Sequence, residues 1–171
     1  MNSRTPERPA ESPAGNAAEI DYAGAVYGSL LAASVVAGTG ALGSFTRVQL
    51  VLLLLCTSVV FWAAHVFSGL FGARMVHHLS WGEVRRACAE ERPIIEAAVP
   101  PACAVAISPL FGLGIEGSAW LALWVALAGQ VGWGTVAASR AGASRRLMML
   151  AGAINLLLGL IIVALKVALK H

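Results

Sequence analysis

The chain has 171 residues, of which 58% are hydrophobic and only 12% are charged, with a formal net charge of +3. A soluble globular domain carries about 45–50% apolar and about 25% charged residues, so this chain has too few charges to cover a water-facing surface. The basic residues are scattered along the sequence, which argues against a nucleic-acid partner. The composition therefore predicts a membrane protein.

The first segment, 1–22, differs from the rest of the chain in its polarity. It is rich in Pro, Glu, Ser and Ala and has almost no large apolar side chain. Such a segment cannot bury enough apolar surface to offset the entropy lost on ordering, so we predict a disordered N-terminal tail. It does not have the pattern of a signal peptide, because the apolar stretch that follows begins late and is long.

Five apolar segments follow, each of 19 to 25 residues. About 20 helical residues cross a hydrocarbon core of ~30 Å, and backbone polar groups in lipid must be satisfied within the segment. We therefore predict an all-α polytopic membrane domain over 23–171 with five transmembrane helices. Pro100, Pro101 and Pro109 lie in the third span, which we expect to be kinked or partly re-entrant. The predicted spans are 23–42, 48–72, 94–113, 119–138 and 147–165.

A short helix is predicted over 80–92, between the second and third spans. It opens with Ser-Trp-Gly-Glu, in which Ser80 and Glu83 have the spacing of a capping box. Glu83, Arg86 and Glu90 share one stripe of this helix, which is typical of a self-neutralised solvated face. Such an amphipathic helix is expected to lie at the membrane surface.

The basic residues indicate the orientation of the spans. With a cytosolic N-terminus, nine Lys and Arg residues fall on the cytosolic side and three (Arg47, Lys166 and Lys170) on the outer side. The positive-inside rule then places the N-terminus in the cytosol and the C-terminus outside a bacterial plasma membrane. Lys166 and Lys170 are expected to extend toward the outer interface.

A polar layer is predicted at one depth in the membrane. His65, Gln130 and Asn155 each lie seven or eight residues from the cytosolic end of their spans, which corresponds to a depth of about 10–12 Å. Glu96 is shallower, at the mouth of the third span, within reach of Arg92. These polar groups either join helices by hydrogen bonds or line a cytosol-facing cavity, in which His65 can titrate near neutral pH or bind metal.

Small and polar residues also recur at helical spacing, which predicts faces that pack against other helices. The first span contains the GxxxG pair Gly24 and Gly28. The second and fifth spans carry the stripes Ser58, Trp62, His65, Gly69, Gly72 and Gly152, Asn155, Gly159, Ile162, Lys166. We expect a protein this small to oligomerise through such glycine faces.

Motifs of catalysis are missing from the sequence. There is no P-loop, GxGxxG, GxSxG or HExxH pattern, so neither an enzyme nor a cofactor is expected. The three cysteines have no CxxC spacing, which argues against a disulfide framework or zinc site. We assign no catalytic or metal-binding residue from the sequence.

Two resemblances bear on function. The stretches YGSLLAASVVAG at 27–38, FWAAHVF at 61–67 and LKVALKH at 165–171 resemble uncharacterised small integral membrane proteins of actinobacteria, which implies a location but no activity. The five spans, the cytosolic N-terminus and the Glu-bearing insert at 80–92 are similar in architecture to the vacuolar iron transporter family. That likeness implies transport of a divalent metal.

Two functions remain open on the sequence. The first is a non-enzymatic membrane or partner-binding subunit, surrounded by lipid and associated with further copies of itself or with a membrane protein partner. The alternative is a small transporter for a divalent metal or a proton, with a cytosol-facing cavity lined by His65, Glu96, Gln130 and Asn155.

Overall fold

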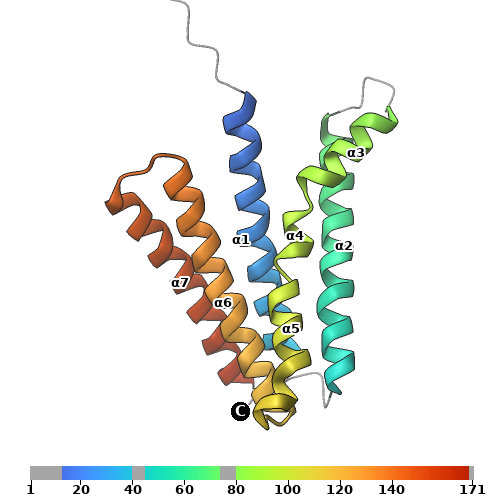
Figure 1. Cartoon of the computed structure of the whole chain (residues 1–171), viewed down its shortest axis with the longest axis vertical. Helices are drawn as coiled ribbons and strands as arrows, with labels where there is room; N and C mark the ends of the chain where they lie inside the picture. Colours follow the sequence, from blue (N-terminus) through green and yellow to red (C-terminus); the bar gives the residue numbers. More distant parts are fainter. Residues whose placement is uncertain (1–12, 40–44, 74–79, 170–171) are drawn as a thin grey trace, which may run out of the picture.

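The computed structural model describes residues 13–39, 45–73 and 80–169, and every regular element within them is helical (Figure 1). The elements are α1 (Pro13–Thr39), α2 (Arg47–Ala73), α3 (Trp81–Glu90), α4 (Pro93–Glu96), α5 (Val99–Ile107), the 3₁₀ helix η1 (Ser108–Phe111), α6 (Ile115–Arg140) and α7 (Arg145–Leu169).

Five segments of the described chain are long and apolar enough to cross a membrane: 22–39, 47–71, 81–111, 115–140 and 145–168. The predicted all-α fold with five spans is therefore confirmed. The observed and predicted ends agree within four residues. The one exception is the start of the third segment, because α3 continues into α4 with only a short break.

The helix α1 begins earlier than the sequence suggested. Residues 13–22 are helical, so the disorder predicted for 1–22 does not hold there, while residues 1–12 lie outside the described part of the chain. The physical reason is that the segment is rich in alanine, a strong helix former. Extending a helix that is already packed also avoids the cost of nucleating a new one.

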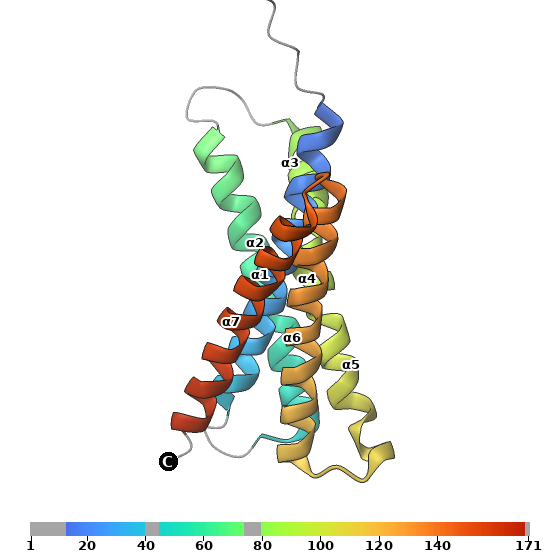
Figure 2. The ribbon, with the colours of Figure 1, turned by 90° about the vertical axis from the view of Figure 1, so that its left-hand side faces the viewer.

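The helix α1 occupies the centre of the bundle. It packs against α2, α4, α6 and α7, and in Figure 1 α2 stands on one side of it and the α6–α7 pair on the other. Figure 2, turned by 90°, shows α6 and α7 running side by side along the length of the molecule. The start of α1 and the end of α7 lie at opposite ends of the bundle, as an odd number of crossings requires (Figure 1).

Prolines interrupt the third span without stopping it. Pro100 and Pro101 have no N–H group, so the carbonyls of Glu96 and Ala97 lose their helical donors, and α4 and α5 are separated there. Pro109 then lies in the first turn of η1. The segment nevertheless reaches the end of the bundle where α6 begins (Figure 1). The predicted interruption of the helix at the prolines is therefore confirmed, and the segment continues to the far end of the bundle.

The GxxxG pair of α1 brings two backbones into close contact. A Cβ atom at Gly28 would lie 2.6 Å from the carbonyl oxygen of Ile94, and one at Gly24 would lie 3.7 Å from the Cβ of Pro93. The prediction of a helix-packing face in α1 is therefore confirmed, with α4 of the same chain as its partner.

Lys166 caps the C-terminal end of α1. Lys166 in the last turn of α7 is only 8% exposed, and its Nζ donates to the carbonyl oxygen of Val36 at 2.9 Å. A cation is favourable at the carbonyl end of a helix, where the helix dipole is negative. The expected extension of Lys166 toward the outer interface is therefore wrong, and Lys170 lies outside the described residues.

We predict that Gly28→Ala destabilises the bundle by about 1–3 kcal/mol, because the added methyl group overlaps the α4 backbone, which cannot rotate away. Gly38→Ala in the same helix is the matched control, since nothing lies within 4 Å of its Cβ position. The free energy of unfolding in detergent measures both. Equal effects of the two substitutions would contradict the assigned contact.

Candidate functional site

A cleft between α2 and α3 contains His65. It has a volume of about 400 Å³. The His65 ring is half-buried and its centroid lies 4.9 Å from that of Tyr27 in α1. The indole Nε1 of Trp62 donates to the carbonyl of Cys88 at 3.1 Å, which ties α3 to α2. The cleft is lined by His65, Val66, Gly69, Leu70, Glu83, Arg86, Ala87, Glu90 and Glu91.

The helix α3 forms as the sequence predicted. The Glu83 N–H donates to the Ser80 hydroxyl at 3.4 Å, and the Ser80 N–H donates to the Glu83 carboxylate at 2.9 Å, which completes the capping box. Arg86 and Glu90 form an ion pair at 2.8 Å. Such an exposed pair contributes about 0–1 kcal/mol, so it satisfies charges more than it stabilises the fold. Glu91 adds a further carboxylate at the cleft.

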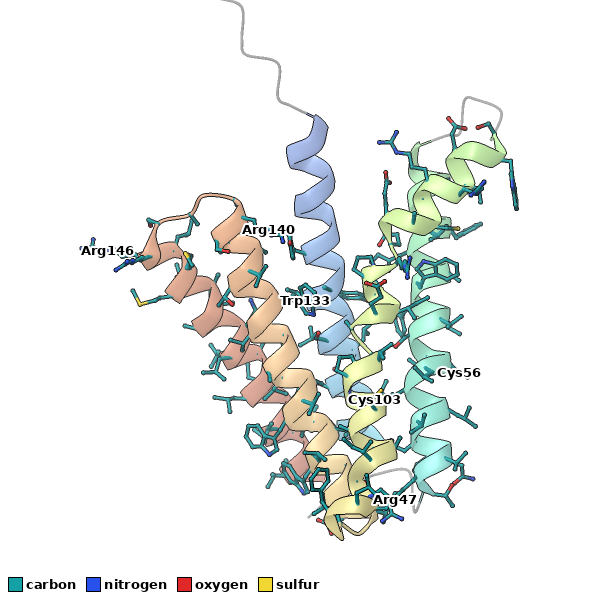
Figure 3. All side chains as sticks on the ribbon, viewed as in Figure 1. Arg47, Cys56, Cys103, Trp133, Arg140 and Arg146 are labelled. Atoms are coloured by element: carbon teal, nitrogen blue, oxygen red, sulfur yellow. The ribbon has the colours of Figure 1, made fainter. Side chains whose placement is uncertain are left out.

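Glu96 lies at a different site from His65. It is exposed and forms an ion pair with Arg92 at 2.7 Å. It lines a second cleft of about 330 Å³, which is bounded by α1, the α3–α4 junction and α6. Figure 3 shows Trp133 and Arg140 extending from α6 toward α1 on this side of the bundle. The lining residues are Tyr22, Ala25, Ala89, Arg92, Pro93, Glu96, Trp133 and Arg140.

Gln130 and Asn155 meet at the contact between α6 and α7. Gln130 is fully buried, and its Nε2 donates to the Oδ1 of Asn155 at 3.5 Å. The Nδ2 of Asn155 donates in turn to the Ala151 carbonyl at 3.0 Å. A Cβ atom at Gly134 would lie 2.6 Å from Asn155 Nδ2, so glycine is needed to admit the amide. The pair therefore joins two helices by hydrogen bonding.

The polar layer predicted from the sequence is thus divided among three places. Gln130 and Asn155 lie together at the contact between α6 and α7. His65 lies on α2, and α1 and the α4–α5 segment separate α2 from the α6–α7 pair (Figure 1). Glu96 occupies its own cleft. Among the side chains of residues 22–39, 45–71 and 80–168, no three of His, Cys, Asp or Glu are close enough together to hold a metal ion.

The Arg92–Glu96 contact was expected from the sequence and is confirmed, but Tyr22, Trp133 and Arg140 were not predicted as parts of a site. The Tyr22 and Trp133 ring centroids are 6.0 Å apart, and the Arg140 guanidinium lies 5.3 Å from the Tyr22 ring centroid. A signal was available, because tyrosine and tryptophan near span ends are typical of membrane interfaces.

Comparison of the chain with protein-family profiles, with curated proteins and with solved structures gives no match.

We predict that Asn155→Leu lowers the free energy of unfolding by about 0.6 kcal/mol, the average measured for hydrogen bonds within membranes, and by no more than the measured maximum of about 1.7 kcal/mol. Adding Gln130→Leu recovers part of this loss, because no buried amide is then left without a partner. Ile154→Leu, at an exposed neighbouring position of α7, serves as the control and leaves stability unchanged. If Asn155→Leu alone abolished folding, a purely helix-joining role would be excluded.

Proposed function

We propose that this chain is a non-enzymatic protein of the bacterial plasma membrane, which binds a basic segment of a membrane protein partner in the cleft between α2 and α3. The observation that carries this proposal is the charge of the cleft. Three glutamates (Glu83, Glu90 and Glu91) line it together with a single arginine, Arg86. An excess of carboxylates favours a partner that presents Lys or Arg side chains.

The proposed orientation places this cleft in the cytosol. Arg140 and Arg146 lie at the end of the bundle where α3 is found, and Arg47 lies at the other end (Figure 3). Arg47 is also held there, because its Nε donates to the Ser118 hydroxyl at 3.4 Å. Since cytosolic loops carry the excess of basic residues, the end with α3 is the cytosolic one.

The interior of the bundle supports a structural use of its polar groups. The Gln130–Asn155 pair joins α6 to α7, and Lys166 joins α7 to α1. Gln130 Nε2 and Lys166 Nζ thereby donate between neighbouring helices, while Gln130 Oε1 is buried without a hydrogen-bond partner among the described residues. A partner-binding subunit requires such a fixed scaffold, with its recognition surface at one end.

A second candidate, cation transport, is favoured by one specific observation. His65 shares the α2–α3 cleft with the three glutamates, and imidazole and carboxylate groups bind protons and divalent metals. In this function the cleft is the cytosolic entrance of a pathway. The architectural resemblance to the vacuolar iron transporter family agrees with it.

Association of several copies is also part of the proposal. Gly24 and Gly28 of α1 and several glycines of α6 and α7 pack against other helices of the same chain, whereas nothing lies within 4 Å of the Cβ position of Gly69 in α2. Gly69 lines the α2–α3 cleft, so its open face belongs to the site proposed for the partner, and we assign no glycine face to a second copy.

One set of variants distinguishes the partner-binding function from cation transport. With a photocrosslinking amino acid at Ala87, we expect a discrete adduct in native membranes that disappears when Glu90→Gln and Glu91→Gln are combined. The matched control is Glu116→Gln, at the start of α6, which keeps the adduct. The same purified proteins in proteoliposomes are expected to move neither protons nor divalent cations.

Other outcomes of this experiment decide against the partner-binding function. Cation flux that is lost in His65→Ala would establish transport instead. The absence of both adduct and flux would exclude both functions.

A further inference from the structure

The cleft between α1, α4 and α6 has the chemistry of a phosphate-binding site at a membrane surface. Two arginines, Arg92 and Arg140, and one glutamate, Glu96, line it. Arg92 is already paired with Glu96 at 2.7 Å. No carboxylate among residues 22–39, 45–71 and 80–168 forms an ion pair with Arg140. The lining therefore has one positive charge in excess, carried by a guanidinium group.

The aromatic side chains indicate the depth of this positive charge relative to the membrane. Trp133 and Arg140 are seven residues apart on α6, so they share a face and are separated by about 10 Å along the helix axis. Tyr22 lies between them, with its ring close to both groups. Arginine, tyrosine and tryptophan thus follow one another from the end of the helix toward the middle of the membrane.

This order matches the structure of a phospholipid. Tyrosine and tryptophan favour the region of the headgroups and the glycerol backbone, and guanidinium groups bind phosphate through paired N–H donors. Basic pockets between transmembrane helices bind anionic lipid headgroups. The cleft volume of about 330 Å³ is within the range of small ligand sites, roughly 300–1,000 Å³. Trp133 is 40% exposed, so its indole remains accessible to an acyl chain.

We propose that this cleft binds the headgroup of an anionic phospholipid of the phosphatidylglycerol type. Arg140 binds the phosphodiester. The Arg92–Glu96 pair lies beside Arg140 and keeps the net charge of the cleft at about one positive charge. The Trp133 indole lies against the start of an acyl chain. This site is separate from the α2–α3 cleft and does not depend on the proposed partner.

Lipid binding to the purified full-length chain tests the proposal. Native mass spectrometry, with titrated dioleoyl phosphatidylglycerol or dioleoyl phosphatidylcholine, measures both affinities. We expect the anionic lipid to bind more tightly, and we expect Arg140→Gln to weaken it by roughly tenfold, equivalent to about 1.4 kcal/mol. Arg146→Gln is the matched control, because this exposed arginine of α7 lies away from the cleft (Figure 3) and its loss changes the affinity less than twofold.

A variant that is expected to bind the anionic lipid more tightly gives the most decisive test. Glu96→Gln removes the negative charge and releases Arg92, so it is expected to tighten binding of the anionic lipid, which a misfolded variant cannot do. Equal affinities for the two lipids, or an equal loss in Arg140→Gln and Arg146→Gln, would overturn the proposal. Soluble glycerol phosphate is the last probe. If it binds as tightly as the lipid, the cleft is a site for free anions and the lipid assignment is wrong.

Discussion

The close approach of α1 and α4 at Gly28 is the contact on which the arrangement of the bundle depends. The two backbones meet so closely there that a single methyl group would overlap the Ile94 carbonyl. The helix α1 also touches α2 on one side and α6 and α7 on the other. The position of α4 against α1 therefore sets where α3 leaves the bundle. Both clefts border this junction, one through Glu91 and the other through Pro93 and Glu96.

Features that depend on local sequence were predictable. The length and hydropathy of the apolar segments determine the number of spans, because the thickness of the bilayer fixes the required helix length. The capping box at Ser80 and Glu83 determines the start of α3, since its two hydrogen bonds are formed within four residues. The break in the third span follows from Pro100 and Pro101, which have no N–H to donate.

The assembly of the candidate site was not predictable in the same way. Counting residues from the ends of the spans gives the depth of His65, Gln130 and Asn155, but it does not give the order of the helices around the bundle. That order places α1 and the α4–α5 segment between α2 and the α6–α7 pair (Figure 1). The second cleft was missed for a related reason, because Tyr22, Arg92 and Arg140 come from three distant parts of the chain.

The bond between Lys166 and Val36 has a consequence for biosynthesis. Its two residues are 130 positions apart in the sequence, so the lysine is synthesised long after the helix that it caps. The carbonyl end of α1 therefore lacks its cationic donor until α7 has been made. Until α7 has been inserted, that end must be satisfied by water or lipid headgroups, so the bundle can reach its final packing only after the insertion of α7.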